Sequence, residues 1–405
     1  MTSIGFERGK TPYTNRDALL DDYTPDELVG RDDELEEYQQ LLNPVIWGDQ
    51  PSNIFLYGKA GVGKTAATKF MLRTLEQDAQ EYDDLDLATL HINCDGLESS
   101  YQVAVRIVNS LREPTQQISE SGYSKAEVYA MMWEEFDSNA GITLLVLDEV
   151  DHVRKDDSIL YQLSRAREND NLETARIGVI GISNDMTFRD RLSAKVKSSL
   201  CERELSFSDY DATELRQVLE QRREVAFKDE SVNDDVIPLC AAYAAQETGD
   251  AREALDYLLV AGDLARDANQ STVTVDHVKE AKSTVERQTI SKGLADRGEQ
   301  SQYVAYAVAT LDAEGRTPVR TTDVYERYER LVDRTGERVL STRWVREHLD
   351  SLAMLGIISA DEINEGAGGG QYKEYELDQA IDVVVDALSD TIDYVGVHES
   401  IQQYY

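Results

Sequence analysis

"GKAGVGKT", residues Gly58 to Thr65, is the stretch of this sequence that decides the fold. It follows the short apolar run "NIFLYG", which begins at Asn53, and it precedes "TAATKFMLRTLEQ", where apolar residues recur at helical spacing. A strand, a glycine-rich loop and a helix in this order are typical of a P-loop. Because the first N–H groups of a helix have no partner inside it, this loop predicts a site for the phosphates of a nucleotide.

Each residue of the loop has an expected role in binding ATP or ADP. We expect the backbone N–H groups of Gly61 to Thr65 to bind phosphate oxygens. The Lys64 side chain would reach the β and γ phosphates, and the Thr65 hydroxyl would ligate Mg²⁺. The other residues expected to contact the nucleotide are Gly58, Ala60, Val62 and Gly63. ATP or ADP with Mg²⁺ is therefore the expected cofactor.

A second apolar run, "GITLLVLDEVD" from Gly141 to Asp151, ends in neighbouring carboxylates. Asp148 would hold Mg²⁺ through water, and Glu149 would polarise the water that attacks the nucleotide. Carboxylates at a strand end are also common on solvated surfaces. With the P-loop upstream, the pair favours ATP hydrolysis.

Two further polar residues follow at positions that suit nucleotide sensing. The apolar run "RIGVIGISND" brings Asn184 to a strand end, which is the place of the first sensor in AAA+ ATPases. "GDAREALDYL" opens a helix with Arg252 in its first turn, as the second sensor does from a helical lid. An arginine at a helix start is otherwise only a surface charge. The order of the four elements predicts an α/β P-loop base of the AAA+ type, a parallel sheet flanked by helices, with a helical lid.

The chain from Ser301 onward predicts a different architecture. Apolar residues recur at helical spacing over residues 303–311, 324–331 and 344–355. "GIIS" and "YKEYEL" then alternate like paired strands around the glycine-rich tip, Gly366 to Gly370. Three helices followed by a hairpin are the winged-helix order, a DNA-binding variant of the helix-turn-helix.

The third of these helices, "STRWVREHLDSLAMLG", is the expected recognition helix. Ser341 would cap it, and three leucines would pack inward: Leu349, Leu352 and Leu355. The residues expected to face a DNA groove are Thr342, Arg343 and Arg346. In the expected wing, Gln371 and Lys373 are weaker candidates for contact with DNA.

An excess of arginine marks this region in an otherwise acidic chain. From Arg316 to Arg346, and including Arg320, eight arginines stand against five carboxylates. Arginines at this density suit contacts to phosphates and base edges of double-stranded DNA. The alternative is a pair of helices with ion pairs four residues apart, such as Glu326 with Arg330.

The composition as a whole is strongly acidic. Asp and Glu number 78 against 41 Lys and Arg, which gives a net charge of −37, and only 13 of the 41 basic residues are lysines. Such a surface is typical of halophiles, although an ordinary acidic cytosolic enzyme is an alternative. At about 1 M salt charges are screened beyond roughly 3 Å, so acidity does not exclude a nucleic-acid partner.

Other classes of protein are disfavoured by the sequence. No run of eighteen apolar residues and no apolar leader occurs, so we expect a cytoplasmic protein with no membrane partner. The three cysteines stand singly in or beside apolar runs and the five histidines are dispersed. We therefore expect buried thiols, and neither a disulfide framework nor a transition-metal site.

Several stretches together resemble the archaeal origin-recognition and cell-division-control initiator family of AAA+ proteins. They are "VGRDDELEEYQQLL", the P-loop, "LLVLDEVDHVRKDDSILYQLSRAREN", "ISND", "KVKSSL", "FSDYDATELRQVLEQR", "GDAR" and the winged-helix block. The likeness covers nearly the whole chain. It implies a protein that binds double-stranded origin DNA and helps to recruit or load the replicative helicase, with ATP and ADP forms of different competence.

The resemblance also implies roles for single residues. Val29, Arg31 and Tyr210 would border the adenine pocket. Residues 97–124 occupy the place of a helical insertion that touches DNA, where Arg106 and Arg112 are the basic residues. An ordinary packed helix is an equal alternative for this segment.

One position departs from the family pattern. Before "VKSS" the family carries an arginine that acts on the nucleotide of a neighbouring subunit, whereas this chain has Lys195. A lysine cannot make the two-pronged contact of a guanidinium. Activation by a second initiator subunit on DNA is thus in doubt, although Arg189 or Arg191 could replace it. We expect slow hydrolysis that acts as a switch.

The expected domains are an N-terminal tail (1–23), the nucleotide-binding base (24–200), the lid (201–289), a linker (290–300), the winged helix (301–395) and a tail (396–405). Two other functions compete with the initiator. One is a sequence-specific transcription regulator on the same scaffold. The other is a helicase or remodelling ATPase, which is disfavoured because no helicase motif or aromatic pore-loop motif follows the P-loop.

Overall fold

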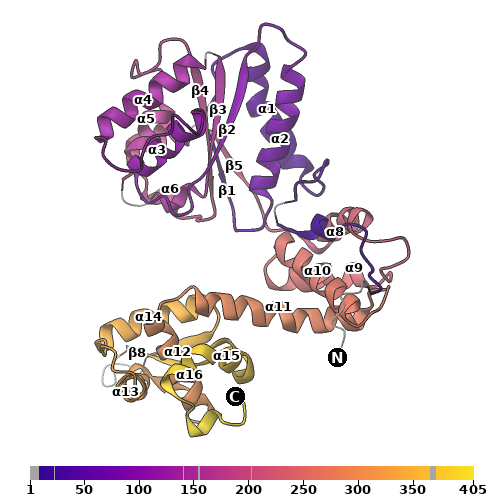
Figure 1. Cartoon of the computed structure of the whole chain (residues 1–405), viewed down its shortest axis with the longest axis vertical. Helices are drawn as coiled ribbons and strands as arrows, with labels where there is room; N and C mark the ends of the chain where they lie inside the picture. Colours follow the sequence, from indigo (N-terminus) through magenta and orange to yellow (C-terminus); the bar gives the residue numbers. More distant parts are fainter. Residues whose placement is uncertain (1–8, 22, 140, 154–155, 202, 365–370) are drawn as a thin grey trace, which may run out of the picture. The chain divides into compact units, whose positions relative to one another are not determined.

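The structure, a computed structural model, describes residues 9–21, 23–139, 141–153, 156–201, 203–364 and 371–405. The chain divides into two compact units, Met1–Val278 and Lys279–Tyr405 (Figure 1). In the described part of the chain, no helix is both long and apolar enough to cross a membrane.

The first unit is built on a parallel sheet with the strand order β2-β3-β4-β1-β5. The strands are β1 (Ile54–Tyr57), β2 (Leu87–Asn93), β3 (Ile142–Asp148), β4 (Arg176–Ser183) and β5 (Arg203–Ser206). All seven residues of β3 are buried, as is typical of a parallel strand that is covered on both faces. All four neighbouring pairs are parallel, so the chain must cross over between one strand and the next, and helices lie in these connections. The parallel sheet flanked by helices is the predicted fold class.

Helices cover both faces of this sheet (Figure 1). One face carries α1 (Asp32–Leu42), η2 (Asn43–Trp47) and α2 (Lys64–Ala79). The elements of the other face are α3 (Ser100–Leu111), α4 (Lys125–Ser138), η3 (Val150–His152), α5 (Ser158–Ser164), α6 (Phe188–Arg191) and α7 (Ala194–Leu200). Successive strand residues point to opposite faces, so Val179 lies in one apolar core and Ile180 in the other.

The helical lid follows the sheet. Its helices are α8 (Ala212–Ala226), α9 (Val236–Glu247), α10 (Ala251–Asp267) and the start of α11 (Val275–Ala295). At the first turn of α8, the Asp211 carboxylate accepts from the backbone N–H of Glu214, and the Glu214 carboxylate accepts from that of Asp211. We expected the base to end at residue 200. Instead β5 lies beyond that point and pairs with β1, so the sheet continues to Ser206.

The segment that we expected as an N-terminal tail (1–23) packs against the lid in the part that the structure describes. Residues 16–19 form the short helix η1, which packs against α8 and α10. The Tyr13 ring stacks on Phe227 with centroids 4.9 Å apart, and its hydroxyl donates to the Leu259 carbonyl at 2.6 Å. Arg16 and Asp263 form an ion pair of 2.7 Å. Aromatic packing and a half-buried ion pair therefore hold this segment on the lid.

The second unit has the predicted three helices and hairpin. Its elements are α12 (Glu299–Ala313), β6 (Val319–Arg320), α13 (Thr321–Val332), α14 (Thr342–Met354), β7 (Ile358–Asn364), β8 (Gln371–Leu377), α15 (Ile381–Ala387), α16 (Ser389–Val395) and η5 (Glu399–Ile401). The strands form an antiparallel sheet in the order β6-β8-β7. The glycine-rich tip, residues 366–370, lies outside the described residues.

The structure adds detail to several expectations for this unit. The expected linker is largely helical, because α11 continues to Ala295 and its Ile290 and Leu294 lie in the core of the second unit. The expected tail after residue 395 is packed, with Ile401 fully buried. Leu355, which we expected to pack inward, is 38% exposed and lies just after the end of α14 at Met354. Ser341 occupies the N-cap position of α14, but its side chain makes no capping hydrogen bond.

The three cysteines are free thiols. Cys94 and Cys240 are buried as predicted, whereas Cys201 is only half-buried at the end of α7.

Candidate nucleotide site and winged-helix surface

The glycine-rich loop joins β1 to α2 with the backbone that its glycines permit. Gly61 and Gly63 have φ of 73° and 92°, a left-handed conformation that other residues rarely adopt. The helix α2 begins at Lys64, whose amino group donates to the carbonyls of Gly58 (2.8 Å) and Lys59 (2.6 Å). Burial lowers the pKa of Lys64 to about 8, although Asp148 and other carboxylates oppose the shift. The side chain is therefore held at the mouth of the loop, where a phosphate would be its natural partner.

The carboxylate of Asp148 lies beside the hydroxyl of Thr65 at the end of β3. Thr65 Oγ1 donates to Asp148 Oδ2 at 2.9 Å, and His91 Nε2 lies 3.2 Å from the same oxygen. Burial alone would raise the pKa of Asp148, but the hydrogen bonds from His91 and Thr65 outweigh it and the pKa is lowered. A hydroxyl and an ionised carboxylate side by side are hard oxygen ligands of the kind that Mg²⁺ prefers.

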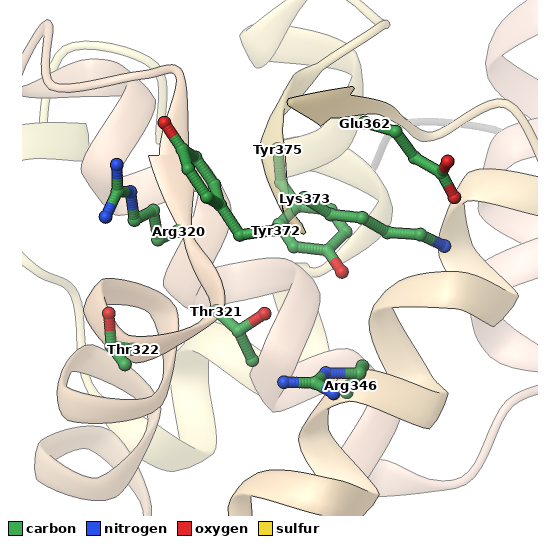
Figure 2. Close-up of a pocket in the computed structure, with 8 residues that line it drawn as sticks. All are labelled: Arg320, Thr321, Thr322, Arg346, Glu362, Tyr372, Lys373 and Tyr375. Atoms are coloured by element: carbon green, nitrogen blue, oxygen red, sulfur yellow. The ribbon is translucent and has the colours of Figure 1, made fainter. Parts of the chain in front are cut away.

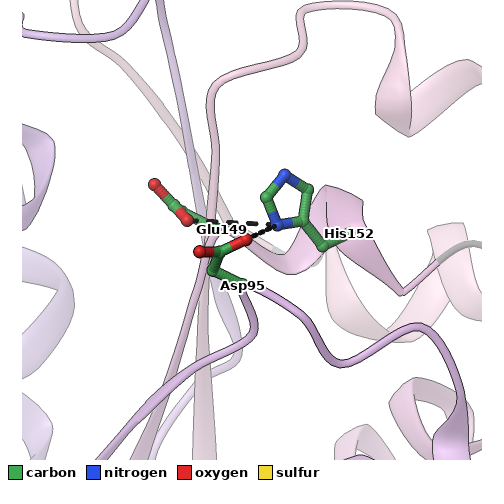
Figure 3. A group of neighbouring side chains, drawn as sticks. All are labelled: Asp95, Glu149 and His152. Atoms are coloured by element: carbon green, nitrogen blue, oxygen red, sulfur yellow. Dashed lines mark ion pairs between the residues drawn. The ribbon is translucent and has the colours of Figure 1, made fainter. Parts of the chain in front are cut away.

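Glu149 follows in a strained backbone conformation, with φ of 54°. Figure 3 shows its side chain together with those of Asp95 and His152. His152 Nδ1 lies 3.2 Å from Asp95 Oδ1 and 4.0 Å from Glu149 Oε2. Burial raises the pKa of Glu149, and the Asp148 carboxylate adds to that shift. A carboxylate with a raised pKa accepts a proton more readily, which suits the expected role of Glu149 toward a water molecule.

The end of β4 is fixed by a carboxylate of η3, the short helix that follows the neighbouring strand β3. Asp151 Oδ1 accepts from the Ser183 hydroxyl at 3.0 Å and from the Asn184 backbone N–H at 3.2 Å. These bonds hold the Asn184 backbone next to Asp148 and Glu149, at the carboxyl edge of the sheet.

The lid contributes the first turn of α10. Asp250 caps this helix by accepting from the Arg252 backbone N–H at 2.6 Å, and Ala251 N–H donates to the Gly61 carbonyl at 3.3 Å. The Arg252 side chain pairs with Asp21 at 3.1 Å. The lid and the glycine-rich loop are thus in direct contact.

A cavity of about 280 Å³ lies between these elements. It brings together eleven of the residues that the sequence nominated: Val29, Ala60, Gly61, Gly63, Lys64, Thr65, Asp148, Glu149, Asn184, Tyr210 and Arg252. Gly58, Val62 and Arg31 do not line it. Val62 is buried in the core, and Gly58 contributes the carbonyl that binds Lys64.

Arg31 lies behind the cavity rather than on its wall. It is 1% exposed, and its guanidinium lies 3.5 Å from the ring centroid of Tyr210, which does line the cavity. It also donates to the Ser208 carbonyl at 2.7 Å and to Glu34 at 2.8 Å. Arg31 therefore positions Tyr210 and the start of the lid.

The cavity also contains residues that the sequence did not nominate. Asn93 is the last residue of β2 and Asn184 directly follows β4, so the same strand-end argument could have found Asn93. Asp21, Gln221 and Arg222 reach the cavity from the N-terminal segment and α8. Arg222 is 8% exposed and stacks on Tyr23 at 4.6 Å. Nothing in the local sequence distinguishes these three residues from surface positions.

Each residue considered for action on a neighbouring subunit has a partner within the chain. Arg189 pairs with Glu204 at 2.8 Å, and Arg191 pairs with Asp185. The Lys195 amino group lies 6.0 Å from the ring centroid of Tyr161.

The segment expected to be a DNA-touching insertion contains a packed helix. Four of the five residues from Val103 to Ile107 are buried, and Arg106 is exposed. Arg112 pairs with Glu135 of α4 at 2.5 Å and is only 18% exposed. The packing matches the alternative of an ordinary core helix, and of the two arginines only Arg106 faces solvent.

On the winged-helix unit the candidate DNA-binding residues differ in exposure and position. The side chain of Arg343 is 86% exposed, Arg346 is exposed and Thr342 is half-buried. Arg320 and Lys373 line a pocket with Arg346, shown in Figure 2. β8 begins at Gln371, whose side chain lies outside the described residues.

Some of the arginines in this arginine-rich region form ion pairs within the unit. Arg327 is 7% exposed and pairs with Glu314 at 2.8 Å. The expected i,i+4 pair of Glu326 and Arg330 is present at 3.9 Å, with both side chains at least 70% exposed, where such a pair contributes little. Arg343 makes a similar pair with Glu347 at 3.2 Å.

Comparison with known proteins agrees with this architecture. The family models described as AAA domain, Cdc6 AAA+ ATPase-type lid domain and CDC6 C-terminal winged helix domain match residues 48–191, 216–283 and 294–387. "ORC1-type DNA replication protein 11" of Haloarcula marismortui is 54% identical over 98% of this chain and 95% of its own length. "ORC1-type DNA replication protein 2" of the same organism is 45% identical over 98% and 96%.

Among solved structures, that of the Aeropyrum pernix ORC1 protein in complex with DNA is 35% identical. It covers 93% of this chain and 97% of its own, with a TM-score of 0.82. The predicted AAA+ base, helical lid and winged helix are thereby confirmed. The chain belongs to the archaeal ORC1/Cdc6 family of AAA+ replication initiators.

Proposed function

We propose that this chain is an ATP-switched initiator that recognises duplex DNA at a replication origin and helps to recruit or load the replicative helicase. The observation that carries the proposal is the cavity in the first unit. It gathers Lys64 and Thr65 of the glycine-rich loop, the β3 carboxylates, Asn184 and the lid residue Arg252 around one space. A nucleotide bound there would contact base and lid together, so its γ-phosphate would influence their relative angle.

Within this cavity the residues nominated from the sequence would have different roles in binding and hydrolysing ATP. The loop N–H groups and Lys64 would bind phosphates, Thr65 and Asp148 would hold Mg²⁺, and Tyr210 with Val29 would enclose the adenine. A bound Mg²⁺ would neutralise charge that develops on the phosphates. Glu149 would orient and deprotonate the attacking water, while Asn184 and Arg252 would contact the γ-phosphate.

Hydrolysis by this site would be slow, as a switch requires. Arg189 and Arg191 are held by carboxylates of their own chain, and Lys195 offers only a point charge. A neighbouring subunit would therefore supply little of the positive charge that accelerates phosphoryl transfer.

The winged-helix unit would provide contact with DNA. The relative from Aeropyrum pernix was solved in complex with DNA, and this chain shares its fold over nearly its whole length. Arg343 and Arg346 on α14 are exposed and supply the donors that a groove or a backbone needs.

A regulator of transcription on the same scaffold is the second candidate. Two ORC1-type proteins of a single halophile, at 54% and 45% identity, both resemble this chain. Where such proteins occur together, one of them is free to take another role at promoters.

Genome-wide immunoprecipitation of the DNA-bound protein in its own cells tests the proposal. Wild type is compared with Lys64→Ala, which removes the phosphate ligand, and with Lys59→Ala, an exposed lysine of the same loop whose salt bridge contributes little. Sharp peaks near replication starts that change in Lys64→Ala and persist in Lys59→Ala would support the ATP-switched initiator. Peaks confined to promoters, with replication unaffected by loss of the protein, would support the regulator.

A further inference from the structure

Arg252 of the lid forms an ion pair with Asp21 of the N-terminal segment, and both residues line the nucleotide cavity. Arg252 Nε lies 3.1 Å from Asp21 Oδ1, and the two side chains are 55% and 60% exposed. The pair joins the first turn of α10 to a part of the chain that is far away in sequence. A γ-phosphate bound in the cavity would therefore meet a guanidinium that already has an anionic partner.

The residues on both sides of Asp21 are held by the lid. The helix η1, which ends at Leu19, packs against α8 and α10. Arg222 of α8 is 8% exposed and donates to the carbonyls of Ala18 and Tyr23, each at 3.4 Å. Asp21 lies between these two carbonyls in sequence, so the same arginine holds the chain on either side of it. The carboxylate is thus kept at the wall of the cavity.

The ion pair lies among three further carboxylates of the lid, Asp250, Glu253 and Asp256. Asp250 accepts from the backbone N–H of Arg252 at 2.6 Å, and Glu253 accepts from two hydroxyls of the lid. Burial raises the pKa of Asp256 to about 6, and the charge of Asp21 adds to the shift. Asp21 therefore pairs with the arginine and also adds to the negative potential in this part of the lid.

The guanidinium of Arg252 lies close to the phosphate-binding loop. Burial lowers the pKa of Lys64 to about 8, and the positive charge of Arg252 adds to the shift. A γ-phosphate bound by Lys64 would therefore lie near Arg252 and Asp21 together. Phosphate oxygens bind a guanidinium strongly, whereas an ion pair as exposed as this one contributes little. The γ-phosphate of ATP would displace Asp21, and ADP, which has no γ-phosphate, would leave the pair intact.

We propose that Asp21 competes with the γ-phosphate for Arg252 and thereby lowers the preference of the cavity for ATP over ADP. The inference rests on the proposed function, because it assumes that ATP binds in this cavity with its γ-phosphate at Arg252. Asp21 is a positioning residue, since it acts through Arg252. The N-terminal segment would then sense the nucleotide: it contacts Arg252 when ADP is bound and loses this contact when ATP is bound.

Asp21→Asn tests the competition, because it removes the charge and keeps the shape of the side chain. Asp17→Asn is the matched control: Asp17 is an exposed carboxylate on η1 in the same segment, and it does not line the cavity. Arg252→Gln and the double variant Asp21→Asn/Arg252→Gln complete a double-mutant cycle, which isolates the part of the effect that passes through the arginine.

The assay is isothermal titration calorimetry with ADP and with the slowly hydrolysed analogue ATPγS, both with Mg²⁺, at several KCl concentrations that keep the protein folded. We expect Asp21→Asn to bind ATPγS about 3-fold more tightly than wild type, with an unchanged affinity for ADP. Asp17→Asn should equal wild type with both nucleotides. The gain in Asp21→Asn should shrink as KCl rises, and it should be largely absent in the Arg252→Gln background.

The alternatives give different results. Weaker binding of ATPγS by Asp21→Asn would mean that Asp21 orients Arg252 toward the phosphate, and would overturn the competition. Equal gains for both nucleotides, no gain, or a gain that persists in full with Arg252→Gln would overturn it too, because the effect would not pass through the arginine and the γ-phosphate. A wild-type protein that binds neither nucleotide would overturn the proposed function itself.

Discussion

The half-buried carboxyl group of Asp256 allows a test of the electrostatics of the lid. Asp256 lies on α10, one turn after Arg252. Burial raises its pKa from 3.8 to about 6, and the carboxylates of Asp21, Asp250 and Glu253 add to the shift while Arg252 opposes it. Replacing Asp256 with asparagine removes the charge and keeps the shape.

The sign of the effect follows from the direction of the shift. A carboxyl group whose pKa is higher in the folded than in the unfolded state makes its full contribution to stability below the unfolded pKa. That contribution is lost as pH rises through about 4 to about 6. At about 1.4 kcal/mol per pKa unit, the ceiling is about 3 kcal/mol at pH 8. Partial exposure and salt reduce this to about 1 kcal/mol.

Denaturant unfolding of Asp256→Asn and wild type at pH 8 and pH 5 measures this difference, in enough KCl to keep both folded. We expect the variant to be more stable by about 1 kcal/mol at pH 8, and the gain to fall by about half at pH 5. Asp229→Asn, at an exposed carboxylate of the same lid, serves as the control for loss of net negative charge. Equal stability of Asp256→Asn and wild type at pH 8, or a gain that does not depend on pH, would refute the reasoning.

Three other changes test the site and its supports. Thr65→Ala should remove most of the effect of Mg²⁺ on ATP affinity in calorimetry, since its hydroxyl lies 2.9 Å from Asp148, and an unchanged Mg²⁺ effect would contradict its role. Arg31→Lys should weaken ATP binding by about 10-fold because a lysine cannot both stack under Tyr210 and bridge its two oxygen partners; wild-type affinity would show that Tyr210 needs no such support. Gly262→Ala should destabilise the lid by about 1–3 kcal/mol in thermal unfolding, because the new methyl group would lie 2.2 Å from the Tyr13 hydroxyl oxygen and 2.5 Å from its ring carbon Cζ; an equal loss when Gly262→Ala is made in a Tyr13→Ala background would exclude this clash as the cause.

The fold could be predicted from sequence where a functional motif also has a characteristic local pattern of residues. The run from Asn53 to Thr65 identified strand, loop and helix, because apolar residues and glycines occur there at the positions that a P-loop requires. The limits of the domains were harder to predict from the sequence. β5 is a strand only because β1 offers it an edge, and the N-terminal segment is ordered by a stacking partner more than 200 residues away. Such pairings are tertiary and leave no local signal.

The candidate site, like the fold, could be predicted where local sequence determines position and could not where tertiary packing does. Residues at strand ends and in the glycine-rich loop were found because position along an element predicts position in space. Arg31 was expected on the wall of the cavity and lies behind Tyr210, a distinction that depends on packing. Arg112 looked like a free cation in the sequence, and it became an internal ion pair only when α4 brought Glu135 beside it. The domain limits and the roles of individual site residues stay predictions until they are tested.

The N-terminal segment has a mechanical consequence. The chain joins base and lid at two places: residues 23–31 run from the segment held on α8 and α10 toward α1, and residues 206–211 run from β5 to α8. A lid with one connection to the base could rotate in any direction. A lid with two connections can rotate only about the axis that passes through both. Nucleotide exchange would then open and close the lid by rotation about this one axis. Arg31 lies at the end of the first connection and donates to the Ser208 carbonyl of the second, so it links the two.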